Sequence, residues 1–376
     1  MNKIRNIGIG ALVVIWLALT ALMWFGPKKT FSDAERRNLD QLPKLNGETL
    51  LDGSFMGEFE GFTQDQFPLR DTFRQVKSIF HNYVLRQGDN NGIYIADGYA
   101  AKMEYPLNTS SVNLCMARFQ NVYDKFLKGK PVKTYVAIVP DKGYYLAEDN
   151  GYLALDYTQL FDRVKTDMSW AKYIDLTDVL EISDYYRTDT HWRQEKLEDV
   201  AKRICETMGV KAPENLSQEK LDRDFYGVYY GQAALPMEGE PMSLVHSPVI
   251  DGCQTYLVEI DEKTYKAKNT LLYEGVYDRE KVSGKDMYET YLSGAQSLLK
   301  IVNPNAKGNK ELVVFRDSFG SSLTPLLLEG YRTVWVVDIR YVSTQVLSRL
   351  LQFRNQDVLF LYSTLVLNTS GSALLQ

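Results

Sequence analysis

The chain has 376 residues, of which 45% are hydrophobic and 24% are charged, and its formal net charge is −5. This composition allows a large buried core and excludes a compositionally disordered chain. The negative net charge and the lack of a basic run exclude a general attraction to phosphate backbones, so we expect no nucleic-acid partner.

The N-terminus contains an uncharged apolar segment. Residues 7–25 read IGIGALVVIWLALTALMWF, and a helix of this length spans roughly 28 Å, enough to cross a bilayer. A secretory signal peptide usually has a shorter apolar core and a small-residue cleavage site, for which ALTALMW is a poor match. We therefore expect residues 1–26 to form an uncleaved transmembrane signal anchor.

The charges beside this segment do not fix its orientation by themselves. Basic residues precede it at positions 3 and 5, and others follow it at positions 28, 29, 36 and 37. A very short, positively charged N-terminal tail is the usual arrangement of an anchor that exports the chain after it. We expect a single-pass protein of the cell membrane, with residues 27–376 forming an extracytoplasmic domain.

Helical and strand patterns follow the anchor. A helix is predicted after residue 70 from a pattern at i, i+3, i+7 spacing: Phe73, Val76, Lys77, Phe80 and Val84. Residues 90–100 (NNGIYIADGYA) indicate a turn and a short strand, and residues 111–128 have a helical pattern. The run 132–140 (VKTYVAIVP) predicts a strand, and 172–176 (KYIDL) a second one. Another helix follows residue 192 and ends at Gly209.

The last third of the chain predicts the fold class. Residues 210–300 are rich in Tyr, Gly and Val in short pieces and indicate a β-rich insertion. After it, strand patterns at 311–315, 332–339 and 357–362 alternate with helical ones. Near-continuous apolar strands separated by helices predict an α/β fold, with a parallel sheet flanked by helices on both faces. In such sheets the chemistry gathers at the carboxyl ends of the strands.

One strand end carries a candidate nucleophile. The segment ELVVFRDSFGSS leads from a predicted strand directly to Ser318. A serine at a strand-to-helix turn lies above the sheet, with backbone N–H groups beside it that can stabilise an oxyanion. The segment lacks the G-x-S-x-G pattern of lipases, and Asp317 is expected to support the turn.

A second segment carries the groups that a serine nucleophile requires. The sequence TDTHW places Asp189 two positions before His191, in a loop that enters a helix. An imidazole accepts the serine proton, and a carboxylate fixes the tautomer of that imidazole. A core histidine with an accidental acidic neighbour remains the alternative from this pattern alone. The other two histidines, His81 and His246, are weaker candidates.

The order of these motifs resembles that of the bacterial DHHW proteins, which are similar to the SGNH-hydrolase-like proteins of alginate O-acetylation. The similarity is carried, in chain order, by DQFPLRD, VPDKGYY, TDTHW, FRDSFGSSLTPLL and VVDIRYV. It implies an SGNH-hydrolase-like fold and a triad of Asp189, His191 and Ser318. Two positions depart from the pattern, since Thr190 replaces the first histidine of the motif and Arg316 stands where many SGNH enzymes have glycine.

Two basic residues follow predicted strands and are candidates for substrate binding. Lys142 lies in VPDKGYY, and Arg340 lies in VVDIRYV. Both can line the edge of the sheet that carries Ser318 and meet a hydroxyl-rich or anionic substrate, although surface ion pairing is an equal alternative. No second soft metal ligand lies near His191 in sequence, so we expect neither a metal site nor a cofactor.

The sequence leaves three functions open. The first is serine-dependent transfer of an acyl group, with acetyl as the favoured group, to a cell-surface or exported polysaccharide. The resemblance implies a membrane-bound O-acyltransferase as a partner that supplies the acyl group. The second is a polysaccharide O-acetyl esterase, which uses the same acyl-enzyme with water as acceptor. The third is a non-catalytic glycan-binding or scaffold subunit, because a fold does not fix a function.

Overall fold

The computed structural model describes residues 2–32, 34–234, 237–284 and 286–369. Contacts within the chain group the residues into two compact units. The first unit comprises residues 1–91 and 230–237, and the second comprises residues 92–229 and 238–376. The functional division into an anchor at 1–26 and an exported domain at 27–376 stays a prediction.

The first unit is mainly helical. Its helices and strands are α1 (Asn2–Phe25), β1 (Phe31–Ser32), β2 (Arg37–Asn38), α2 (Gly47–Leu51), α3 (Ser54–Asp65), α4 (Arg70–Ile79) and the π-helical turn η1 (Phe80–Val84). The helix predicted after residue 70 is thus confirmed as α4 and its continuation η1. Within α1, Ile4–Phe25 is long and apolar enough to cross a membrane.

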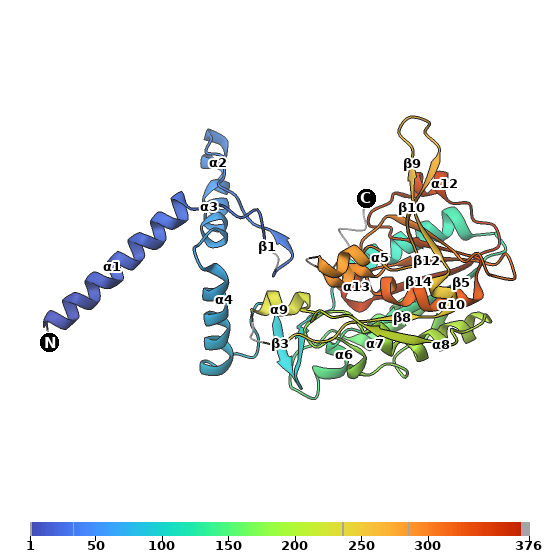
Figure 1. Ribbon diagram of the computed structural model, residues 1–376, viewed down its shortest axis with the longest axis horizontal. Coiled ribbons are helices and arrows are strands. Elements are labelled where there is room, and N and C mark those ends of the chain that lie inside the picture. The colour runs from blue at the N-terminus through green and yellow to red at the C-terminus, as the bar shows by residue number, and fades with distance from the viewer. Residues whose placement is uncertain (1, 33, 235–236, 285, 370–376) are drawn as a thin grey trace. The chain divides into compact units, whose positions relative to one another are not determined.

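The second unit is an α/β structure (Figure 1). Its strands are β3 (Ile93–Ala96), β4 (Tyr99–Lys102), β5 (Lys133–Val139), β6 (Lys172–Ile174), β7 (Ser217–Lys220), β8 (Ser243–His246), β9 (Gln254–Ile260), β10 (Ala267–Glu274), β11 (Leu298–Val302), β12 (Glu311–Arg316), β13 (Thr333–Val337) and β14 (Asp357–Ser363). Its α-helices are α5 (Thr109–Val122), α6 (Gly143–Leu146), α7 (Tyr157–Asp167), α8 (Glu198–Met208), α10 (Pro248–Asp251), α11 (Phe319–Leu323), α12 (Thr344–Leu350) and α13 (Thr364–Thr369). Helix α9 (Val228–Ala233) contains residues of both units.

Short helical turns complete the second unit. They are η2 (Tyr123–Leu127), η3 (Ile182–Asp184), η4 (Gln194–Lys196), η5 (Arg279–Ser283), η6 (Met287–Thr290) and η7 (Thr324–Gly330). The strands predicted near 132–140, 172–176, 311–315, 332–339 and 357–362 correspond to β5, β6, β12, β13 and β14, which confirms them.

The central sheet has eight strands in the order β10-β9-β11-β13-β12-β14-β5-β6. Strands β13, β12, β14, β5 and β6 are mutually parallel, whereas β11, β9 and β10 pair antiparallel with their neighbours. The segment 210–300 therefore extends one edge of the main sheet through β9, β10 and the start of β11. The predicted sheet is confirmed as mostly parallel.

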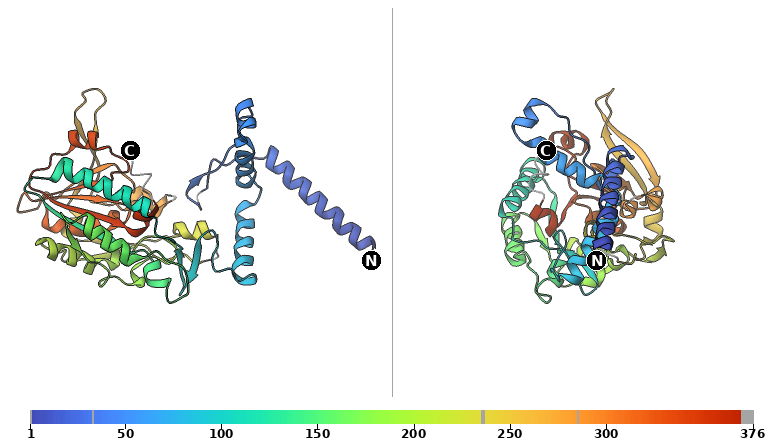
Figure 2. Two further views of the ribbon diagram at one scale, coloured as in Figure 1. Left: turned by 180° about the vertical axis from the view of Figure 1, so that it is seen from behind. Right: turned by 90° about the vertical axis from the view of Figure 1, so that its left-hand side faces the viewer.

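The sheet is buried because alternate side chains of its strands enter two hydrophobic cores. In β12, Leu312 and Val314 join a core with residues of α8 and η7, whereas Val313 and Phe315 join a core with residues of α5, α7 and α12. Helices therefore cover both faces of the sheet, as Figures 1 and 2 show. This burial explains why the parallel strands read as continuous apolar runs.

The parallel pairing brings three loops to one edge of the sheet. Strand β12 pairs in register with β13 on one side and with β14 on the other, and β14 pairs with β5. The segments after β5, β12 and β13 consequently leave the sheet at the same edge. These segments carry Lys142, Ser318 and Arg340 respectively.

Candidate active site

Ser318 lies between the end of β12 and the start of α11. Asp317 shapes this turn, because its Oδ1 accepts the N–H of Phe319 at 3.0 Å and its Oδ2 accepts both the N–H and the hydroxyl of Ser363 at 2.7 Å. The expected supporting role of Asp317 is thus confirmed. A Cβ at Gly320 would lie 2.6 Å from the Cβ of Arg316, so the turn requires glycine there.

The hydroxyl of Ser318 meets the imidazole of His191. The Oγ of Ser318 lies 2.7 Å from Nε2 of His191, although the two residues are 127 positions apart in the chain. The other ring nitrogen, Nδ1, lies 2.5 Å from Oδ1 of Asp189. A carboxylate only accepts hydrogen bonds, so Nδ1 carries the proton and Nε2 presents a lone pair to the serine.

The carboxylate of Asp189 is held from two further directions. Its Oδ1 also accepts the backbone N–H of His191 at 3.0 Å, and its Oδ2 accepts the N–H of Val228 at 2.7 Å. Asp189 is fully buried. A Cβ at Gly227 would lie 2.3 Å from the Cα of Asp189, so the chain can pass this close only with glycine at position 227. No sequence motif pointed to Gly227 or Val228 as neighbours of Asp189.

Trp192 joins the loop of His191 to the turn of Ser318. Its buried indole N–H lies 3.1 Å from the carbonyl of Phe319 and 2.9 Å from Oγ of Ser322. The amide of Gln194 donates to the carbonyl of Ser322 at 2.8 Å. Trp192 and Gln194 therefore both tie the loop of His191 to the segment that follows Ser318, and these bonds hold the imidazole close to the serine hydroxyl.

Two residues that the sequence did not single out complete the surroundings. The ring of Tyr288 stacks on the ring of His191, with centroids 3.9 Å apart and an angle of 10° between the planes. Buried Glu240 accepts the N–H groups of Arg187 and Thr188 at 3.0 and 2.9 Å. Tyr288 comes from η6 and Glu240 from the segment before β8. Because both lie far in the sequence from the motif that contains His191, the motif did not point to them.

Lys142 is buried at the edge of the sheet, where its ammonium contacts protein groups. Its Nζ donates to the carbonyls of Tyr186 and Arg187 at 2.9 and 3.3 Å, and it lies 5.1 Å from the ring centroid of Tyr229. Burial lowers the pKa of Lys142 to about 7, although the nearby carboxylates of Asp189, Glu240 and Asp141 oppose this shift.

Arg340 forms a bidentate ion pair at the end of β13. Its Nε and one terminal nitrogen lie 2.9 and 2.7 Å from the two carboxylate oxygens of Asp338. Burial disfavours the charge, but the hydrogen bonds and charge of Asp338 prevail and raise the pKa of Arg340. The substrate-binding roles of Lys142 and Arg340 stay predictions, and in the structure both charged groups engage protein groups.

Arg316 occupies the position where many SGNH enzymes have glycine. One of its terminal nitrogens donates to the carbonyl of Gly294 at 2.8 Å, and burial lowers the pKa of its guanidinium. Its side chain thereby ties the end of β12 to the loop after η6. Within the described ranges, no group of three or more His, Cys, Asp or Glu side chains has a geometry that could hold a metal ion.

The arrangement has the features of an SGNH-hydrolase-like α/β protein with a Ser-His-Asp constellation at the carboxyl edge of its sheet. Solved structures have the same fold. A DHHW family protein from Eubacterium siraeum DSM 15702 aligns with a TM-score of 0.58 and 20% identity, over 76% of this chain and 95% of that one. PatB1 of Bacillus cereus with a sulfonyl adduct aligns with a TM-score of 0.56 and 17% identity, over 74% of this chain and 96% of that one.

These alignments confirm the SGNH-hydrolase-like fold and, at the level of the fold, the resemblance to DHHW proteins that the motifs indicate. A second structure of PatB1 from Bacillus cereus aligns with a TM-score of 0.53. No protein-family model and no curated protein matched the sequence.

The lowered pKa of Lys142 predicts a pH dependence of stability. The group loses its proton near pH 7 in the folded chain but near its ordinary value of about 10.4 in the unfolded chain. Between these values the unfolded chain binds more protons, so stability increases with pH by up to about 1.4 kcal/mol per pH unit from this group.

Replacement of Lys142 by Met removes this contribution. In urea unfolding between pH 7 and 10, the free energy of unfolding of the wild type should therefore gain on that of Lys142→Met as the pH rises. Lys307→Met, at an exposed position, is the matched control and should run parallel to the wild type. Parallel curves for Lys142→Met as well would contradict the lowered pKa.

Proposed function

We propose that this protein is a membrane-anchored, extracytoplasmic O-acyltransferase that transfers an acyl group, acetyl in the simplest case, to a hydroxyl of a cell-surface or exported polysaccharide. The observation that carries the proposal is the contact of Ser318 with His191, which in turn contacts Asp189. A serine hydroxyl becomes a nucleophile when a neighbouring imidazole accepts its proton.

The first half of the proposed reaction forms an acyl-enzyme. Oγ of Ser318 attacks the acyl carbonyl while Nε2 of His191 takes the hydroxyl proton. Asp189 stabilises the resulting imidazolium through its contact with Nδ1. When the tetrahedral intermediate collapses, His191 gives the proton to the leaving oxygen, and the acyl group stays on Ser318.

The second half passes the acyl group to the acceptor. A sugar hydroxyl attacks the acyl carbon and yields its proton to His191, which then returns it to Oγ of Ser318 as the ester bond to the enzyme breaks. The backbone N–H of Ser318 is the candidate oxyanion donor, since no hydrogen bond to another described residue occupies it. The N–H of Phe319, the neighbouring candidate, already donates to Asp317.

The cellular setting is part of the same proposal. Helix α1 is the membrane anchor, the remainder of the chain lies outside the cytoplasm, and a membrane-bound O-acyltransferase supplies the acyl group. The apolar length of α1 supports the anchor. The fold shared with a DHHW family protein and with PatB1 supports the class of the site, while the polysaccharide and the acyl donor rest on the motif resemblance.

Substitution of the three residues tests the chemistry. With p-nitrophenyl acetate, Ser318→Ala and His191→Ala should lower kcat/KM by at least about 10³-fold, and Asp189→Asn by roughly 10²–10⁴-fold. Ser348→Ala, at an exposed serine, is the control and should leave the rate unchanged. Rates of wild type and all variants at the same low level would support a non-catalytic scaffold instead.

The nature of the acceptor separates a transferase from an esterase. Because both enzymes form the same acyl-serine, they differ only in the group that attacks it. With acetyl donor and an unacetylated oligosaccharide in water, we expect acetylated sugar to form at the expense of free acetate, as measured by mass spectrometry. Acetate as the sole product at every oligosaccharide concentration would identify an esterase.

A further inference from the structure

Helix α4 and the turn η1 present an apolar row to the outside of the first unit. Five large apolar side chains form this row, which we call the apolar stripe: Leu69, Phe73, Val76, Phe80 and Val84. Each is about half exposed or more, with Leu69 at 68% and Val76 at 59%. Their spacing of three or four residues places them along one side of a continuous helical segment.

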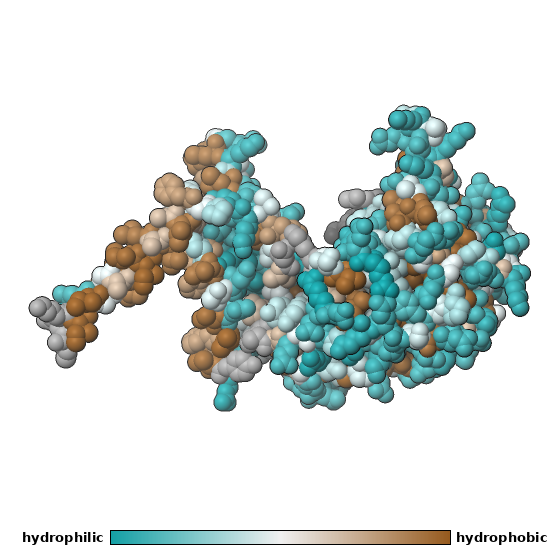
Figure 3. Space-filling view, viewed as in Figure 1, coloured by the Kyte–Doolittle hydropathy of each residue, from teal (hydrophilic) through white to brown (hydrophobic). Residues whose placement is uncertain are grey.

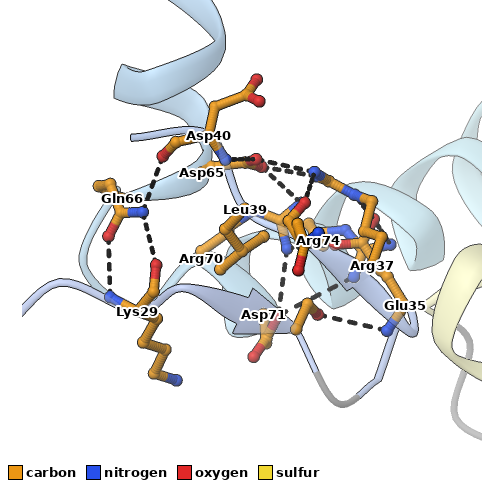
Figure 4. A network of polar contacts seen from close by, with 12 residues as sticks. Lys29, Glu35, Arg37, Leu39, Asp40, Asp65, Gln66, Arg70, Asp71 and Arg74 are labelled. Carbon is orange, nitrogen blue, oxygen red and sulfur yellow. Dashed lines mark hydrogen bonds and ion pairs between the residues drawn. The ribbon is translucent and has the colours of Figure 1, made fainter. Parts of the chain in front are cut away.

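Another side of α4 carries ion pairs, which Figure 4 shows. Arg70 lies 2.6 Å from a carboxylate oxygen of Glu35 and 3.2 Å from one of Asp65, and Arg74 lies 3.2 Å from Glu35. Asp65 also pairs with Arg37 at 2.6 Å. The basic side chains of α4 therefore bind other residues of the first unit, whereas the apolar stripe is exposed on its surface.

Contacts fix the start of α4 to the end of the apolar helix α1. Trp24, in the last turn of α1, lies 6.2 and 6.3 Å from the ring centroids of Phe59 and Phe62 in α3. Gln66 accepts the N–H of Lys29 at 3.1 Å and donates to the carbonyl of Lys29 at 2.8 Å. The apolar stripe thus begins three residues after a group that is bonded to the chain leaving α1.

We propose that the apolar stripe lies in the interface of the lipid bilayer that α1 crosses. Trp24 and the pair Lys28 and Lys29 have the composition of a membrane–water boundary, where aromatic and basic residues gather. A segment fixed at this boundary, with apolar side chains on one face and basic ones on the other, has the chemistry of an interfacial helix. Figure 3 shows hydrophobic surface on α1 and hydrophobic patches along one side of α4.

The geometry of the segment suits this position. Helix α4 and η1 together comprise 15 residues, which correspond to roughly 22 Å of helix. A helix of this length is too short to cross the hydrocarbon core but long enough to bury a row of apolar side chains below the headgroups. This inference rests on the proposed role of α1 as a membrane anchor, and it adds a second membrane contact to that anchor.

Fluorescence of the full-length protein in nanodiscs of phosphatidylcholine and phosphatidylglycerol tests the inference. The three native cysteines are buried, and burial raises the pKa of each thiol to about 12, so an added surface cysteine takes the label selectively. An environment-sensitive fluorophore is placed at Val76→Cys in the stripe, at Gln75→Cys on an exposed position away from it, and at Leu12→Cys in α1.

We expect lipid-attached nitroxide to quench the label at position 76 several-fold more strongly than the label at position 75, and aqueous iodide to give the reverse order. Equal quenching at 75 and 76, with strong lipid quenching at position 12, would overturn the interfacial helix while leaving the anchor in place. A label at 76 shielded from both quenchers would also overturn it, since protein would then cover the stripe. Loss of lipid quenching at position 12 would overturn the anchor itself and this inference with it.

Discussion

The hydrogen bond between His191 and Ser318 is the constraint on which the candidate site depends, because it joins segments 127 positions apart. Other hydrogen bonds hold the two segments and tie them to each other. The turn of Ser318 is held by Asp317 and Ser363, and the loop of His191 is held by Trp192 and Gln194. A hydrogen bond between two such supported groups loses little conformational entropy when it forms, so the imidazole and the hydroxyl are preorganised for proton transfer.

Buried charge sets the electrostatics around this bond. The carboxylates of Asp189 and Glu240 lie in the interior beside the buried ammonium of Lys142. Both carboxylates accept backbone N–H groups, and Lys142 donates to backbone carbonyls in the same loop. Because unsatisfied charges are costly in an apolar interior, these contacts restrict the loop to a narrow range of conformations. The carboxylate of Asp189, which orients His191, is thereby shielded from water.

The sequence predicted those strands and site residues that local patterns mark. The parallel strands appeared as apolar runs, and TDTHW and FRDSFG contained the residues that the structure brings together. The sequence did not predict contacts that form only in the folded chain. Glu240, Gly227 and Tyr288 belong to the site, but they come from segments with no recognisable motif. The helical spacing of Phe73, Val76 and Phe80 predicted a helix correctly, yet periodicity does not state what an apolar face meets. In α4 that face points outward, because Arg70 and Arg74 use the other face for ion pairs.

The central claim for this protein is that His191 activates Ser318, the serine at the carboxyl edge of the α/β unit. Reaction with a sulfonyl fluoride, followed by peptide mass mapping, tests this claim most directly, because such reagents modify activated hydroxyl groups. We expect one adduct on the peptide that contains Ser318 in the wild type and none in His191→Ala. An adduct at another residue, or equal modification of Ser318 without His191, would contradict it.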